Sequence, residues 1–250
     1  MSAPDSRTAP DEPEPTPPGV GLLPDRLARA DDAARRLLAR GVFSAVSLAV
    51  SRRGALVHER FFGTTRYAGS APVTARSLFA IASVTKPLAA AAVMLLLERG
   101  LFHLGTPVTD LVPDFGHKGK KDVTVEHLLT HTSGISERWI DAVPCSTRDE
   151  YRARIRQAPL LWPAGSHVAY CSAAFSALED VIEHTTGMPA AQFLADELFA
   201  PLGMADTHYQ PAEAHHARLV ECRRPTGQDM VRHLLDVGTL GGAIFSTVRA

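Results

Sequence analysis

The sequence predicts an α+β fold, and three features support this prediction. A helical pattern between Pro24 and Gly41 comes first, and two apolar, β-prone runs follow it within residues 43–62. From about residue 83 to about residue 237, most segments have a helical pattern. Because the two strands are consecutive and do not alternate with helices, a doubly wound parallel sheet is disfavoured. We therefore expect an N-terminal helix and antiparallel strands packed on a helical region.

The N-terminal helix and hairpin have clear local signals. Apolar residues recur at helical spacing after Pro24, and Gly41 provides a stop. The runs Phe43 to Val50 and Ala55 to Phe62 are joined by Ser51-Arg52-Arg53-Gly54, which predicts a β-hairpin.

A central helix is expected to begin next to Ser83. Residues Leu78 to Ala82 favour an extended approach, and Pro87 suits the first turn of a helix because its missing N–H has no partner there in any case. Leu88 to Leu97 is apolar on all sides, which predicts burial, and Gly100 ends the pattern. Ser83 is thus predicted at a helix N-terminus, where backbone N–H groups stabilise negative charge.

The remaining elements are predicted to be mainly helical. The expected helices are Pro107–Val112, Thr124–Thr130, Thr147–Gln157, Ala173–Thr186 with Gly187 as its stop, and Phe193–Phe199. An apolar segment punctuated by glycines covers Gly238 to Phe245, and Ser246-Thr247 has the character of a helix N-cap three residues before the last residue. This unfinished cap suggests an incomplete domain.

Composition and charge exclude several classes of function. The net charge is −1 and no sustained basic face is present, so a nucleic-acid partner is not expected, and the Lys118 to Lys121 cluster is interpreted as a solvated loop. The longest apolar run, Leu88 to Leu97, is too short to cross a bilayer. Residues 1–21 are rich in proline and acidic residues and lack an export signal, so we expect a disordered lead.

Three cysteines are too few and too scattered for a disulfide framework or a zinc site, which fits a reducing, cytoplasmic location. Cys171 is interpreted as a small buried residue, with a reactive thiol as the alternative. No histidine cluster with metal-ligand spacing and no glycine-rich phosphate loop occurs, so neither a metal nor another cofactor is expected. The absence of a Gly-x-Ser-x-Gly motif also removes the α/β-hydrolase alternative.

Ser83-Val84-Thr85-Lys86 is the main candidate for chemistry. Residues three apart share a helix face, so the amine of Lys86 can lie beside the Ser83 hydroxyl and accept its proton. Only four of the 26 basic residues are lysines, and arginine could not serve as a base. The alternative, that Lys86 is an ordinary lysine extending its ammonium to solvent at a helix end, stays open on residue types alone.

Further motifs follow Ser83-x-x-Lys86 in a fixed order: His131-Thr132-Ser133-Gly134, Tyr170-Cys171-Ser172 and Pro201-Leu202-Gly203-Met204. From about Leu27 to its end, the chain resembles the serine β-lactamase and penicillin-binding-protein-like superfamily, in particular the branch of class C β-lactamases, D-Ala-D-Ala peptidases and related esterases. The resemblance implies a β-lactamase/transpeptidase-like fold for residues 22–250. It also implies Ser83 as nucleophile, Lys86 as proton acceptor and Tyr170 as a second general base that protonates the leaving group.

Two departures from the family pattern bear on activity. Ser172 stands where the family usually has asparagine, which favours esters over β-lactams or peptides. The third motif, Lys-Thr-Gly or His-Thr-Gly on a strand, occurs nowhere in the chain; His131 to Gly134 and His184 to Gly187 are near misses with one extra residue. In the family this strand supplies the second oxyanion donor, so we expect a C-terminally truncated member with impaired activity.

Gly241 and Gly242 are expected to bring the backbone close to the site and, with Ser172, to contact substrate. The predicted function is that of a serine hydrolase acting on a small-molecule ester or amide, without nucleic acid or membrane. An acyltransferase using the same residues and a non-catalytic relative that binds an acylated ligand are the alternatives. The sequence does not determine an oligomeric state.

Overall fold

The computed structural model describes residues 16–223 and 229–249, so most of the predicted lead lies outside the described residues. The chain divides into two compact units, one ending at Ala75 and the other beginning at Arg76, within the region predicted as one domain. Pro18–Val20, inside the predicted lead, forms a 3-10 turn.

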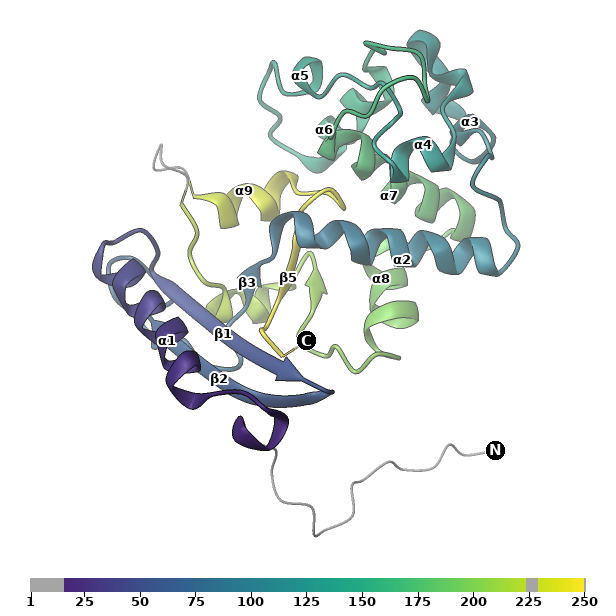
Figure 1. Cartoon of the computed structure of the whole chain (residues 1–250). Coiled ribbons are helices and arrows are strands. Elements are labelled where there is room, and N and C mark those ends of the chain that lie inside the picture. The colour runs from purple at the N-terminus through teal and green to yellow at the C-terminus, as the bar shows by residue number, and fades with distance from the viewer. Residues whose placement is uncertain (1–15, 224–228, 250) are drawn as a thin grey trace. The chain divides into compact units, whose positions relative to one another are not determined.

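In its described part, the first unit has one α-helix and one hairpin after the Pro18–Val20 turn (Figure 1). Helix α1 covers Pro24–Ala39, and strands β1 (Ala45–Arg52) and β2 (Ala55–Gly63) pair antiparallel. The turn between them has positive φ at Arg53 (54°) and Gly54 (79°), a conformation that matches the twist of a tight hairpin. The predicted helix and hairpin are therefore present.

The second unit combines a small sheet with many helices. Its sheet has the order β3-β5-β4, formed by Phe79–Ala80, Ile244–Ser246 and His208–Tyr209, with both pairs antiparallel. Its α-helices are α2 (Thr85–Glu98), α3 (Val108–Leu111), α4 (Val125–Leu129), α5 (Glu137–Ile140), α6 (Arg148–Gln157), α7 (Ser172–Thr186), α8 (Ala190–Leu194) and α9 (Met230–Val237). Other helical segments are 3-10 helices at Ala82–Val84, Pro113–Asp122, which is kinked at residues 117–119, and Glu213–Arg218, and a π-helix at Ala195–Phe199.

Helices α2 and α7 form the centre of the second unit, where α2 runs beside α7 and α8 (Figure 1). Ala89, Ala92, Val93 and Leu96 are fully buried on α2, and almost every residue in the first ten of α7 is buried. Gly187 ends α7 in the left-handed conformation (φ 68°), as the sequence predicts. This packed core fixes the N-termini of both helices, which is where the candidate site lies.

The C-terminal segment differs in detail from its prediction. Ser246 is the last residue of β5, and its hydroxyl shares a hydrogen bond with that of Thr207. Ser246 therefore pairs with Phe79 in a sheet, whereas the sequence predicts that Ser246-Thr247 is a helix N-cap. The mixed helix and sheet architecture confirms the α+β prediction.

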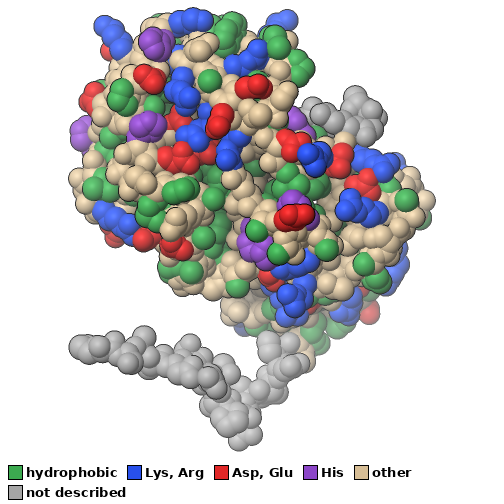
Figure 2. All heavy atoms as spheres, turned by 180° about the vertical axis from the view of Figure 1, so that it is seen from behind, with side chains coloured by type: hydrophobic (Ala, Val, Ile, Leu, Met, Phe, Trp, Pro, Cys, Tyr) green, Lys and Arg blue, Asp and Glu red, His purple; other side chains and the backbone are tan. Residues whose placement is uncertain are grey.

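On the face shown in Figure 2, basic and acidic side chains are interspersed across the described surface. This mixture agrees with the net charge of −1. Within the described residues, no helix has the length and apolar character needed to cross a membrane.

Candidate active site

Ser83 lies at an elbow between strand β3 and helix α2. The preceding residue, Ala82, has a φ of 46°, in the left-handed region that non-glycine residues rarely adopt. Ala82 begins a single 3-10 turn that ends at Val84, and α2 follows from Thr85. This strained turn places the Ser83 hydroxyl at the N-terminus of the central helix, where the helix dipole favours developing negative charge.

Lys86 is buried and has three oxygen partners. Its side chain lies one turn after Ser83, and the residue is 6% exposed. Its Nζ atom donates to Ser83 Oγ at 3.3 Å, Ser172 Oγ at 3.1 Å and the Gly241 carbonyl at 2.6 Å. An ammonium group has three donors, and all three are used here. The lysine is therefore held in place beside the hydroxyl and does not extend into solvent.

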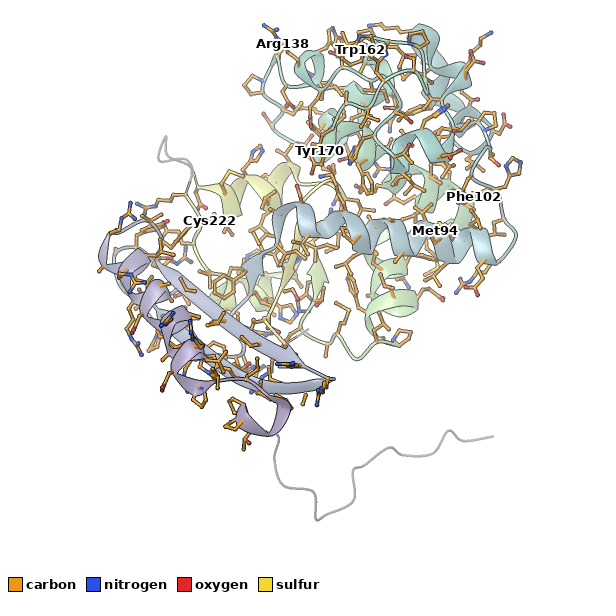
Figure 3. All side chains as sticks on the ribbon, viewed as in Figure 1. Met94, Phe102, Arg138, Trp162, Tyr170 and Cys222 are labelled. Atoms are coloured by element: carbon orange, nitrogen blue, oxygen red, sulfur yellow. The ribbon has the colours of Figure 1, made fainter. Side chains whose placement is uncertain are left out.

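Tyr170 approaches the same hydroxyl from another part of the chain. Its Oη donates to Ser83 Oγ at 2.8 Å, and its ring centroid lies 4.7 Å from Lys86 Nζ. Figure 3 labels Tyr170 in the segment that leads into α7. Partial burial raises the pKa of Tyr170, but hydrogen bonds with Lys86 and Ser83 and the Lys86 charge outweigh burial, so its pKa lies below that of an ordinary tyrosine.

His131 supports the segment that carries Tyr170, a role that the sequence analysis missed. Its Nδ1 accepts the Cys171 N–H at 3.3 Å, and its ring lies 4.5 Å from the Tyr170 ring. Burial and then the Lys86 charge lower the pKa of His131, which favours the neutral ring that can accept this bond. In the sequence, the His131-Thr132-Ser133-Gly134 turn is a near miss of the third motif and gives no signal of this supporting role.

Glu137 is a second supporting residue that sequence reasoning missed. Its Oε1 accepts the N–H groups of Ser172 at 2.8 Å and Ala173 at 3.2 Å, so a carboxylate from α5 caps the N-terminus of α7. A negative group is favourable at a helix N-terminus.

Cys171 Sγ accepts the N–H of Ala174, and burial raises the thiol pKa to about 12, which favours a packing role for this cysteine.

Gly241 brings the backbone against α7, and this approach requires a glycine. A Cβ atom at residue 241 would lie 2.6 Å from both the Ser172 carbonyl oxygen and Ser176 Oγ, which is too close for any side chain. Gly242 has more room, because its nearest neighbour would be Ala82 at 3.8 Å. The structure thus brings both predicted glycines to the Ser83 elbow, and Gly241 contacts Lys86 directly.

A cavity of about 630 Å³ opens beside Ser83 and is walled by α5, the loop after it, α7 and α9. Its lining residues are Ala82, Ser83, Ile140, Asp141, Val143, Pro144, Cys145, Tyr151, Ser172, Ser176, Met230, His233, Leu234, Val237, Gly238, Thr239, Gly241 and Gly242. This volume lies within the range of small-molecule sites in proteins. Ser83, Ser172 and both glycines thus face one space.

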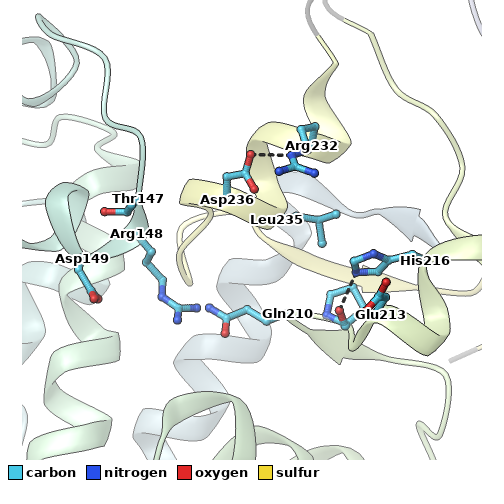
Figure 4. Close-up of a pocket in the computed structure, with 10 residues that line it drawn as sticks. Thr147, Arg148, Asp149, Gln210, Glu213, His216, Arg232, Leu235 and Asp236 are labelled. Carbon is cyan, nitrogen blue, oxygen red and sulfur yellow. Dashed lines mark hydrogen bonds and ion pairs between the residues drawn. The ribbon is translucent and has the colours of Figure 1, made fainter.

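A separate cavity of about 550 Å³ lies between the start of α6 and helix α9 (Figure 4). It is lined by Arg148, Gln210, His216 and Arg232, among others, and Arg232 is paired there with Asp236. The residues that line the two cavities do not overlap. The candidate chemistry therefore belongs to the cavity beside Ser83.

Among the described residues, no group of three or more His, Cys, Asp or Glu side chains could hold a metal ion.

Solved structures of known proteins share this fold. A penicillin-binding-protein homologue from Pyrococcus abyssi superposes with a TM-score of 0.75 at 24% identity, covering 89% of this chain and 54% of that one. A class C β-lactamase from Rhodobacter sphaeroides gives a TM-score of 0.70 at 20% identity, covering 88% of this chain and 62% of that one. The fold is thus that of penicillin-binding proteins and class C β-lactamases.

The Beta-lactamase family model matches residues 30–250, and the chain belongs to this family. Among curated relatives, esterase EstB of Burkholderia gladioli is 35% identical over 184 residues, which are 66% of this chain and 46% of that protein. Penicillin-binding protein 4 of Amycolatopsis lactamdurans is 31% identical over 190 residues, which are 73% of this chain and 47% of that protein. The chain spans about half the length of these relatives. The predicted family resemblance is confirmed.

Proposed function

We propose that this protein is a serine hydrolase that forms an acyl-enzyme on Ser83 and hydrolyses small carboxylic esters. The observation that carries the proposal is the convergence of Lys86 Nζ and Tyr170 Oη on one hydroxyl, at 3.3 Å and 2.8 Å. A serine hydroxyl is a weak nucleophile unless a neighbouring base removes its proton, and this site offers two candidate bases. The family membership and the similarity to an esterase support the same reaction class.

In the proposed reaction, Ser83 Oγ attacks the ester carbonyl carbon while its proton passes to Lys86. For this step Lys86 must first release the proton that it directs at Ser83 Oγ in the structure; its neutral amine can then accept the Ser83 proton while still donating two hydrogen bonds, to Ser172 Oγ and the Gly241 carbonyl. The Ser83 N–H, at the start of α2, would stabilise the oxyanion. The C–O bond to the leaving group then breaks, and Tyr170 protonates the departing alkoxide.

Water completes the cycle by attacking the acyl-enzyme. Its proton passes to the Tyr170 phenolate left by the first step, the bond between Ser83 Oγ and the acyl carbon breaks, Lys86 returns its proton to the Ser83 oxygen, and the carboxylic acid leaves. Because Tyr170 is 58% exposed, solvent can reach the side of the site on which this attack takes place. The same exposure favours a second candidate function, acyl transfer, in which an alcohol replaces water as the attacking molecule.

Labelling with a fluorophosphonate tests the proposed nucleophile. We expect one adduct on Ser83, located by peptide mass spectrometry, together with hydrolysis of p-nitrophenyl butyrate. Ser83→Ala should abolish both while leaving the circular dichroism spectrum and thermal midpoint unchanged, because only a hydroxyl is removed. Ser146→Ala, at an exposed serine outside the cavity lining, is the matched control. A folded protein that takes no adduct would support a non-catalytic binding protein instead.

A further inference from the structure

The cavity beside Ser83 lies on one side of the reacting hydroxyl. Ser83 is one of its lining residues, but Tyr170, which contacts the same hydroxyl at 2.8 Å, is not. In the reaction proposed above, the leaving group must lie near Tyr170 to receive its proton. The acyl group, on the opposite side of the carbonyl carbon, would then enter the cavity.

Apolar side chains from two elements form much of the cavity wall. Ile140, Val143 and Pro144 come from α5 and the loop after it, and Met230, Leu234 and Val237 come from α9. Burying apolar surface against such walls stabilises a bound hydrocarbon chain. Two facing apolar walls therefore suit an alkyl or aryl acyl group.

The charged residues of the cavity lining also favour an uncharged acyl group. Among the described residues that line this cavity there is no arginine or lysine, whereas Asp141 is present. Lys86 lies next to the site, but its three donors already meet Ser83, Ser172 and Gly241. A carboxylate inside the cavity would therefore lose water with His233 as its one possible cationic partner among the described lining residues, and it would be repelled by Asp141.

We propose that this cavity is an acyl-binding site for neutral, apolar acyl groups of several carbons and that it discriminates against acyl groups carrying a carboxylate. This inference rests on the proposed acyl-enzyme at Ser83 and adds the substrate class. It also assigns Val143 and Asp141 as specificity-determining residues. Both residues are exposed at the cavity wall, so they can be replaced with little effect on the core.

A series of p-nitrophenyl esters with a constant leaving group tests the inference. From acetate through butyrate to hexanoate, we expect kcat/KM to rise by up to about fourfold per added methylene, the value for its full transfer from water. The hemisuccinate ester, which has a four-carbon acyl chain ending in a carboxylate, should be at least about tenfold poorer than butyrate. A flat series, or a preference for hemisuccinate, would overturn the inference.

Two variants test whether Val143 and Asp141 determine the preference between neutral and carboxylate-bearing acyl groups. Val143→Arg places a cation at the apolar wall and should reduce the ratio of kcat/KM for butyrate to kcat/KM for hemisuccinate. Asp141→Asn should reduce the same ratio by removing the repelling charge. Val168→Arg, at an 81% exposed valine outside the lining, is the control for a nonspecific charge effect. Equal responses to Val143→Arg and Val168→Arg would contradict the assigned location.

A binding measurement separates failure of this inference from failure of the proposed function. The Ser83→Ala variant cannot form an acyl-enzyme, but its cavity remains, so hexanamide should raise its thermal midpoint more than succinamate does at equal concentration. Stabilisation by hexanamide without ester turnover in the parent protein would reject the hydrolase and retain the acyl site. Turnover with equal stabilisation by both ligands would reject the acyl site and retain the hydrolase.

Discussion

Lys86 Nζ lies 2.6 Å from the carbonyl oxygen of Gly241, closer than to either of its two hydroxyl partners. These residues are separated by 155 positions in the sequence, and the bond is buried. A backbone carbonyl accepts hydrogen bonds but carries no proton to exchange, so it orients the amine without competing for the proton of Ser83. The position of the Gly241 segment therefore decides how Lys86 faces its serine.

Gly241→Ala should disrupt this contact. The new Cβ would lie 2.6 Å from two α7 atoms, so the segment must shift and carry its carbonyl away from Lys86. We expect a loss of unfolding free energy of about 1–3 kcal/mol and a fall in kcat of about tenfold or more. Denaturant unfolding and ester kinetics measure the two effects. Gly242→Ala, with its nearest contact at 3.8 Å, should lose much less stability.

Lys86→Arg tests whether the lysine acts by accepting a proton. Because arginine keeps its charge but cannot be deprotonated, kcat should fall by about 10²–10⁴-fold if Lys86 is a general base. Lys86→Met is the second variant, since it removes the charge without adding bulk to a buried position. Lys121→Arg at an exposed lysine provides the control. Near-normal turnover by Lys86→Arg would assign the proton transfer to Tyr170 alone.

Tyr170 should impose a pH dependence on the reaction. Its folded-state pKa lies below 10.0 because the Lys86 and Ser83 contacts outweigh the opposite effect of burial. Tyr170 must begin the reaction in its acid form to protonate the leaving group, and this form is lost at lower pH than in a free tyrosine, so kcat/KM should fall as the pH rises, with an inflection below 10. In Tyr170→Phe this inflection should disappear, with kcat reduced by about 10²-fold or more. An identical pH profile in the variant would show that another group is responsible.

Glu137→Ala should weaken the start of α7. Removing the acceptor of two N–H groups at a helix N-terminus costs about 0.5–2 kcal/mol, and the same change frees Ser172, the partner of Lys86. We expect a lower unfolding midpoint and a lower kcat. Glu137→Gln retains an acceptor oxygen and should recover much of both. If Glu137→Ala lowers stability without any change in kcat, the cap is structural only.

The local elements of this protein follow from local sequence. The hairpin turn at Arg53-Gly54, the burial of α2 and the glycine stop of α7 each depend on residues a few positions apart. The pairing of Ser83 with Lys86 belongs to the same class, because a spacing of three residues places both side chains on one side of a helical turn. The order of the motifs was enough to predict the family, which the family match confirms.

The tertiary structure decided the rest of the site, because contacts between distant residues depend on the path of the chain. Tyr170 reaches Ser83 across 87 positions and Glu137 reaches Ser172 across 35, and no local periodicity encodes either approach. His131 and Glu137 were missed for this reason: each acts by accepting a backbone N–H, and a backbone group leaves no side-chain signature in the sequence. The cavity beside Ser83 likewise depends on the path of the chain, because α5, α7 and α9, which are far apart in the sequence, line one space.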